Sequence, residues 1–132
     1  MKYLLDTHAI ILALTESEKL SDTAQKILVD PDKDIVVSAV SFWEIALKFS
    51  LGKLDLVGYT PDEFASACIA TGFFFLDLSA EFSSSYHKFT ASHHKDPFDR
   101  MLIWQAITYK YTLISDDEHV KKYKSEGLKV IW

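Results

Sequence analysis

The sequence has a single cysteine, Cys68, and therefore cannot form an internal disulfide. Cys68 lies in a helix-like stretch from Phe64 to Ile69, which favours a small buried hydrophobic residue over a catalytic thiol. No apolar run is long enough to cross a bilayer, and Asp6 and His8 interrupt the run that resembles a signal-peptide core. These absences predict a protein of the reducing cytoplasm that does not bind membranes.

A surplus of basic residues is also absent. The chain has 14 Lys and Arg against 19 Asp and Glu, which gives a formal net charge of −5. Because nonspecific binding to phosphate draws on Lys and Arg, this chain is not expected to hold nucleic acid simply by being basic. A nucleic-acid function would need a local site, where metal ions could bridge protein carboxylates to phosphate.

Linkers rich in Pro, Gly or Ser, internal repeats and low-complexity tracts are missing as well, and the chain contains only 4 Gly and 3 Pro. Its composition, 48% hydrophobic and 25% charged, is typical of an ordered globular protein. A chain of 132 residues fits one core. We therefore expect a single domain over residues 1–132.

Short apolar runs suited to buried strands alternate with segments of helical periodicity. The apolar runs are Lys2–Leu5, Ile35–Ser38, Phe73–Leu78, Thr112–Ser115 and Leu128–Ile131. The helical segments are Ser21–Val29, Ser41–Leu51 and Phe98–Tyr111. This alternation implies right-handed βαβ crossovers, because parallel strands need long connections. The expected fold class is α/β, a three-layer α/β/α sandwich with a mostly parallel central sheet.

Four acidic positions that are far apart in the sequence map onto the carboxyl edge of this sheet, where α/β folds bind ligands. They are Asp6, Glu44, Asp99 and the pair Asp116 and Asp117. Carboxylates gathered in one place raise one another's pKa, and stay ionised together only with a cation among them. Oxygen ligands of this kind suit Mg²⁺ or Mn²⁺.

Helix capping is the competing explanation for these acids taken singly. The residues that fit such caps are the pairs Ser41 with Glu44 and Ser115 with Glu118, and Asp96 before Pro97. The helix dipole would also favour Glu44 and Asp99 in first turns. Asp6 is harder to explain in this way, because it lies between two apolar runs where an unpaired charge is costly.

The other polar and aromatic residues form no comparable pattern. The histidines have no zinc-like spacing with Cys68, and His93 and His94 are expected in an exposed loop. Lys48 and Arg100 are the basic residues most closely associated with the acidic edge. Core packing is the expected role of the aromatic residues, including the run at 73–75, and is favoured over base stacking even for Trp43 beside Glu44.

Four segments, in their order and spacing, resemble the successive motifs of VapC-like PIN domains. They are LLDTH at 4–8, SAVSFWEIALK at 38–48, DPFDRMLIWQA at 96–106 and LISDD at 113–117. The resemblance extends over nearly the whole chain. It implies a metal-dependent endoribonuclease with a parallel sheet flanked by helices, commonly dimeric and neutralised by a cognate antitoxin.

The resemblance also implies roles for individual residues. The catalytic, metal-binding acids of the family fall on Asp6, Glu44 and Asp99. Its fourth acid stands two residues beyond a hydroxyl residue that ends the strand, which selects Asp117 and leaves Asp116 as the alternative. Residues at positions that support the metal ligands in the family are Thr7, Ser115 and Arg100.

The expected function is hydrolysis of RNA phosphodiester bonds with Mg²⁺ or Mn²⁺, by the toxin of a type II toxin–antitoxin pair. RNA is the expected substrate, an antitoxin the expected partner and a homodimer the expected assembly. A catalytically silent PIN fold that binds RNA or protein is the alternative. A phosphoacceptor receiver domain is disfavoured, because it needs an acidic pair after the first strand and here Thr7 and His8 follow Asp6. The RNA target, the antitoxin and the number of metal ions stay open.

Overall fold

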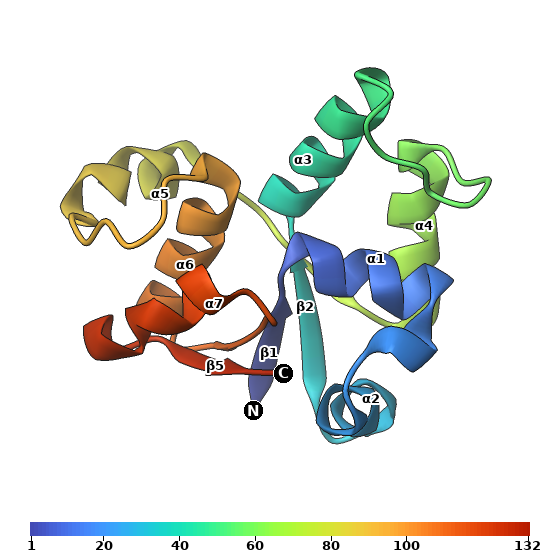
Figure 1. Ribbon diagram of the computed structural model, residues 1–132, viewed down its shortest axis with the longest axis horizontal. Coiled ribbons are helices and arrows are strands. Elements are labelled where there is room, and N and C mark those ends of the chain that lie inside the picture. The colour runs from blue at the N-terminus through green and yellow to red at the C-terminus, as the bar shows by residue number, and fades with distance from the viewer.

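The computed structural model describes residues 1–132, which fold around a five-stranded parallel sheet (Figure 1). The strands are β1 (Lys2–Leu5), β2 (Asp34–Ser38), β3 (Phe74–Leu76), β4 (Thr112–Ile114) and β5 (Lys129–Ile131). Their order across the sheet is β3-β2-β1-β4-β5. Tyr3 at the centre pairs with Ile35 on one side and Thr112 on the other. The strand order reverses between β1 and β4, and this switch point is where parallel α/β sheets form ligand crevices.

Helices cover both faces of the sheet, so the expected α/β/α class is confirmed (Figure 1). They are α1 (Thr7–Thr15), α2 (Asp22–Val29), α3 (Ala39–Ser50), α4 (Pro61–Thr71), α5 (Ala80–Ser85), α6 (Pro97–Tyr109) and α7 (Glu118–Lys121). None of these helices combines the length and apolarity needed to span a membrane.

Alternating side chains of the strands build two separate hydrophobic cores, because successive residues of a strand point to opposite faces. Leu5 packs into the core formed with α1, α2 and α4, whereas Leu4 packs into the core formed with α6 and α7. Helix α3 contributes to both, through Ile45 on one side and Val40 on the other. Cys68 of α4 is buried as expected, and burial raises the pKa of its thiol to about 12.

Two of the capping boxes that the sequence allows do not form. Helix α3 begins at Ala39, with Ser38 accepting a hydrogen bond from the backbone N–H of Val40. Ser41 and Glu44 therefore form no capping box, and Glu44 lies in the second turn. The Ser115 and Glu118 pair also fails, because the cap of α7 is Asp117. In both cases the chain offers two capping residues a few positions apart, and the structure uses Ser38 in place of Ser41 and Asp117 in place of Ser115.

Core packing does not explain all the aromatic residues. The side chains of Phe74 and Phe75 are 57% and 47% exposed, because the short strand β3 forms one edge of the sheet. Phe73 is buried but precedes the strand. Trp43 is 63% exposed and meets the Phe98 ring edge-on, with 5.1 Å between ring centroids. The core-packing expectation is therefore wrong for Trp43, Phe74 and Phe75.

Candidate active site

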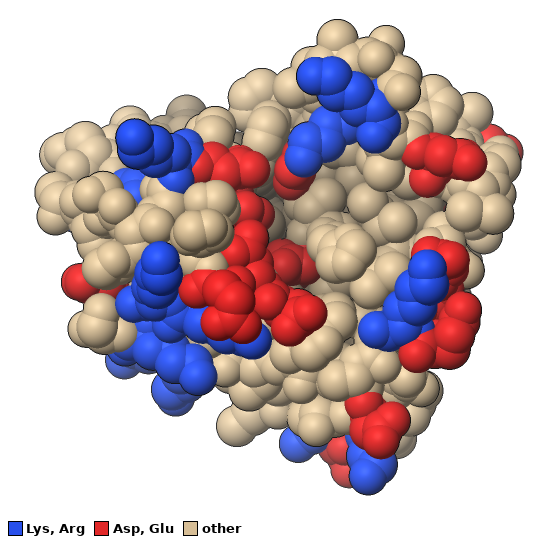
Figure 2. All heavy atoms as spheres, in the orientation of Figure 1, with Lys and Arg blue, Asp and Glu red and all other residues tan.

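A cavity of about 520 Å³ is lined by residues that follow the carboxyl ends of β1, β2 and β4. Its acidic lining residues are Asp6, Glu44, Asp96, Asp99, Asp116 and Asp117. Lys48 and Lys53 are its basic lining residues. Figure 2 shows the acidic side chains gathered in a hollow at the middle of this face. The fold thus brings the sequence-predicted acids together from four separate segments.

Asp6 leaves β1 and becomes the N-cap of α1, where its Oδ1 accepts a hydrogen bond from the Ala9 backbone N–H at 2.7 Å. Asp6 therefore does cap a helix, contrary to the argument from the sequence, because the apolar run that follows it is helical. Burial raises the pKa of Asp6, although hydrogen bonds from Ser115 and from Ala9 oppose this rise. A buried carboxylate with a raised pKa favours a cation nearby.

Glu44 is buried in the second turn of α3. The Thr7 hydroxyl donates to its Oε1 at 2.6 Å, and the Lys48 ammonium pairs with its Oε2. The hydrogen bond with Glu44 raises the pKa of Lys48. Both oxygens of the carboxylate are thus oriented by neighbours from α1 and from the next turn of α3.

Asp99 lies in the first turn of α6, below the cap that Asp96 makes to the backbone N–H groups of Phe98 and Asp99. The predicted cap at Asp96 is therefore confirmed. Burial raises the pKa of Asp99 to about 6, the hydrogen bond with His94 opposes the rise, and the charges of Asp96, Glu44 and Asp6 add to it. In the metal-free chain, burial and the neighbouring carboxylates therefore disfavour the ionised form of Asp99.

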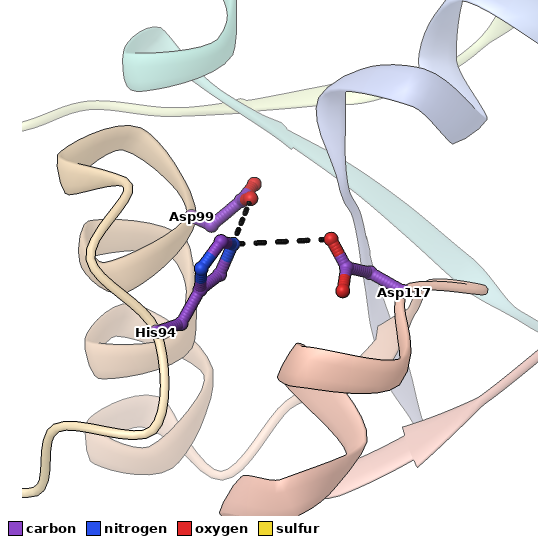
Figure 3. Close-up of side chains that lie close together, drawn as sticks. All are labelled: His94, Asp99 and Asp117. Carbon is purple, nitrogen blue, oxygen red and sulfur yellow. Dashed lines mark hydrogen bonds and ion pairs between the residues drawn. The ribbon is translucent and has the colours of Figure 1, made fainter.

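No sequence motif singles out His94, and the expectation that it lies in an exposed loop is wrong. Its side chain is only 17% exposed, and its Nε2 lies 2.8 Å from Asp99 Oδ2 and 3.8 Å from Asp117 Oδ2 (Figure 3). One ligand atom from each of the three residues falls within 4.8 Å of the others. No metal-ligand spacing in the sequence predicts this group, because its residues come from the loop before α6, from α6 and from the cap of α7.

Asp117 and Asp116 both line the cavity but have different neighbours. Asp117 caps α7 by accepting from the His119 backbone N–H with Oδ1, while its Oδ2 faces His94. Its own backbone N–H donates to the buried Ser115 hydroxyl. Asp116 is more exposed and pairs with Lys121 at 3.5 Å. Of the two, Asp117 is the one drawn toward Asp99.

Arg100 lies away from the acids, although the sequence associated it with them. Its guanidinium stacks on Phe89, 4.6 Å from the ring centroid, and donates to the carbonyl oxygens of Phe89, Ala91 and His94. It also donates to the Tyr123 hydroxyl. Arg100 therefore does not line the cavity. Its hydrogen bonds to backbone carbonyl oxygens hold the loop that carries His94.

The donor set of the cavity fits a hard divalent cation. Asp6, Glu44, Asp99 and Asp117 offer carboxylate oxygens, which Mg²⁺ and Mn²⁺ prefer over softer ligands. The raised pKa values of Asp6 and Asp99 indicate carboxylates that lack a compensating positive charge. Lys48 pairs directly with Glu44, and its charge also interacts at longer range with Asp96 and Asp99.

The family model of the PIN domain matches residues 3–126. The chain belongs to the PIN-domain family. A search of curated proteins gave no match to this PIN domain. The identification confirms the family resemblance of the four sequence motifs.

Solved structures share the fold of this PIN domain at low sequence identity. VapBC2 from Rickettsia felis, solved bound to a DNA fragment from the promoter, has a TM-score of 0.69 and 17% identity, over 100% of this chain and 99% of that one. VapBC-1 from nontypeable Haemophilus influenzae has a TM-score of 0.63 and 19% identity, over 99% and 97%. A domain of a functionally unknown Methanocaldococcus jannaschii protein has a TM-score of 0.60 and 17% identity, over 99% and 89%.

Proposed function

We propose that this PIN domain is a metal-dependent endoribonuclease in which Asp6, Glu44, Asp99 and Asp117 hold Mg²⁺ or Mn²⁺. The observation that carries the proposal is the convergence of these four carboxylates, from four separate segments, on one cavity at the switch point of the sheet. Membership of the PIN family supports a nuclease activity.

The protein's own residues would orient the site and receive the substrate. A divalent cation held by the acids would supply the positive charge that stabilises the reacting phosphate and activates water. Thr7 fixes the Glu44 carboxylate by its hydrogen bond. Lys48 and Lys53 at the cavity wall offer positive charge to the phosphates of the RNA backbone. This local charge opposes the repulsion between RNA and the net negative charge of the chain.

The purified protein, incubated with single-stranded RNA, tests the activity directly. We expect cleavage with Mn²⁺ or Mg²⁺, and none after a chelator removes the metal. Glu44→Gln is the matched variant, because the amide keeps the shape of the side chain and weakens its binding to a cation. Equal cleavage by both proteins would overturn the proposal, and RNA binding without cleavage would favour the catalytically silent alternative.

We further propose that this nuclease is the toxin of a toxin–antitoxin pair, that it acts in the cytoplasm, and that it forms a homodimer. Two structures with the same fold are VapBC proteins, which supports a partner protein. Exposed apolar side chains on α3, at Trp43 and Leu47, and at its C-cap Leu51 support a contact with another protein chain. Light scattering of the chain alone tests the dimer, since a monomer at micromolar concentration would contradict it.

Toxicity is tested by expressing the chain without a partner in bacteria. We expect growth arrest by the wild-type chain and normal growth with Asp99→Asn at equal expression, because the amide cannot supply the ligand charge. Arrest by both would mean that toxicity does not depend on the acidic site. Arrest by neither would contradict the toxin assignment.

A further inference from the structure

The loop before α6 is held in place by several hydrogen bonds from Arg100 and Tyr123. Arg100 donates to the carbonyl oxygens of Phe89, Ala91 and His94. The Tyr123 hydroxyl accepts from the backbone N–H of His94 at 3.0 Å. The backbone of His94 is therefore held on both its N–H and its carbonyl side. This fastening fixes the direction in which the imidazole leaves the loop.

The imidazole lies between two acids from different elements (Figure 3). Its Nε2 is within hydrogen-bond distance of Asp99 Oδ2, at 2.8 Å, whereas Asp117 Oδ2 is too distant for a hydrogen bond, at 3.8 Å. The ring also stacks on His119, with centroids 5.2 Å apart. His94 thus makes one directed contact with the acidic cluster.

The other ring nitrogen decides which atom carries the proton. Nδ1 of His94 lies 3.2 Å from the backbone nitrogen of Lys95, which carries a hydrogen. A backbone N–H can only donate, so Nδ1 must present its lone pair. In the neutral imidazole the single proton then sits on Nε2, where Asp99 Oδ2 accepts it.

We propose that His94 is a positioning residue that donates its Nε2–H to Asp99, and that it is not a ligand of the metal. Ligation through Nε2 would require the lone pair there and the proton on Nδ1, directly against the Lys95 N–H. As a donor, His94 fixes one oxygen of Asp99 and leaves the other free for a cation. The metal role of Asp99 rests on the proposed function, but the hydrogen bond itself does not.

The tautomer is measured on the metal-free chain by ¹⁵N NMR of the histidine side chains at a pH where the rings are neutral. We expect His94 to have a protonated Nε2 and an unprotonated Nδ1, and to keep this pattern after addition of diamagnetic Mg²⁺. A proton on Nδ1, or an Nε2 signal that shifts to a metal-bound position with Mg²⁺, would overturn the proposal. This measurement uses the wild-type protein and needs no nuclease activity.

Two substitutions test whether the hydrogen bond to Asp99 matters for metal binding, while ligation itself is tested by the NMR experiment. The amide nitrogen of Gln is as many bonds from Cβ as Nε2 of His, and that of Asn is one bond nearer. In calorimetric titrations with Mn²⁺, we expect His94→Gln to bind within about threefold of the wild type. We expect His94→Asn to bind roughly 10- to 100-fold more weakly, as for other groups that orient metal ligands. Equal losses in both variants would overturn the donor role. A wild type that binds no Mn²⁺ would instead contradict the proposed metal site, with the NMR result unaffected.

Discussion

At the scale of the residue, several acids of the cavity have two roles at once. Asp6 and Asp117 each use Oδ1 to cap a helix while they also line the cavity. A carboxylate has two oxygens and room for several hydrogen bonds, so one oxygen can serve the helix and the other a ligand. Capping and metal binding, which the sequence presented as alternatives, are compatible.

The choice between the two adjacent acids is tested by Asp117→Asn and Asp116→Asn. An amide keeps the cap of α7 through its carbonyl oxygen, so a loss reflects ligand charge and not helix stability. We expect Asp117→Asn to lower RNA cleavage at limiting Mn²⁺ at least about tenfold, since even groups behind a metal ligand cost that much. Asp116→Asn, which loses only one of the two carboxylate charges that pair with Lys121, should stay within about twofold. The reverse order would place the fourth ligand at Asp116.

The raised pKa of Asp99 predicts that the stability of the metal-free protein depends on pH. Its pKa is about 6 in the folded chain against an ordinary 3.8, so the folded state binds a proton more tightly than the unfolded state. Stability from this group is therefore greatest below about pH 4, falls as the pH rises from 4 to 6, and is lowest above 6. The side chain is 20% exposed, and the difference corresponds to at most about 3 kcal/mol.

Asp99→Asn tests this sign, because the amide cannot ionise and can still accept from His94. We expect the variant's metal-free melting temperature to exceed that of the wild type at pH 7.5, and the gain to shrink as the pH is lowered to 4. The measurement is a thermal melt with chelator at several pH values. A variant less stable than the wild type at pH 7.5 would mean that Asp99 stabilises the apo fold.

At the scale of the element, a buried hydrogen bond joins the start of α3 to the middle of α6. Ser38 caps α3 and its hydroxyl also donates to Gln105 Oε1 at 2.7 Å, and both residues are fully buried. The two helices carry Glu44 and Asp99, so this contact helps to set the distance between two walls of the cavity.

Ser38→Ala should lower the free energy of unfolding by about 3 kcal/mol, as the sum of a lost cap and an unsatisfied buried carbonyl. Ser21→Ala is the matched control, because the Ser21 hydroxyl also caps a helix, α2, by accepting from the Ala24 backbone N–H. It should cost only about 1 kcal/mol. Denaturant unfolding gives both values, and equal losses would show that the bond to Gln105 contributes nothing.

The exposed side of α3 shows where a helical pattern is a poor guide to burial. Trp43, Leu47 and Leu51 follow one another at four-residue spacing and are all exposed. The sequence pattern identifies the helix, but Ile45 and Val40 are the residues that reach the cores. Apolar residues of this segment that contribute to neither core stay exposed, whatever their spacing.

At the scale of the whole molecule, a cation that binds only the native state must stabilise it. At free Mn²⁺ one hundred times its dissociation constant, the gain is about 2.7 kcal/mol. We expect the wild-type melting temperature to rise with Mn²⁺ and that of a chain with Asp6, Glu44 and Asp99 all changed to amides to stay constant. Parallel rises in both proteins would indicate binding elsewhere on the acidic surface.

Local sequence rules determined the fold class and the edge at which the acids gather. Strand and helix periods are set by residues close in the chain, and parallel strands always place their carboxyl ends together. Asp6, Glu44, Asp99 and the pair Asp116 and Asp117 could therefore be assigned to one edge without coordinates. The family motifs reinforced this assignment.

Only the tertiary structure decided the contacts that reach this edge from other directions. His94 reaches Asp99 because Arg100 and Tyr123 fasten its loop. The Arg100 side chain lies away from the acids because it follows Asp99 directly in α6. It therefore projects about 100° around the helix from Asp99, toward Phe89. Trp43 stays largely exposed because its contact with Phe98 of α6 is edge-on and leaves most of the indole uncovered. Such contacts depend on how elements distant in sequence are placed in space, and no periodicity or short-range spacing contains that information.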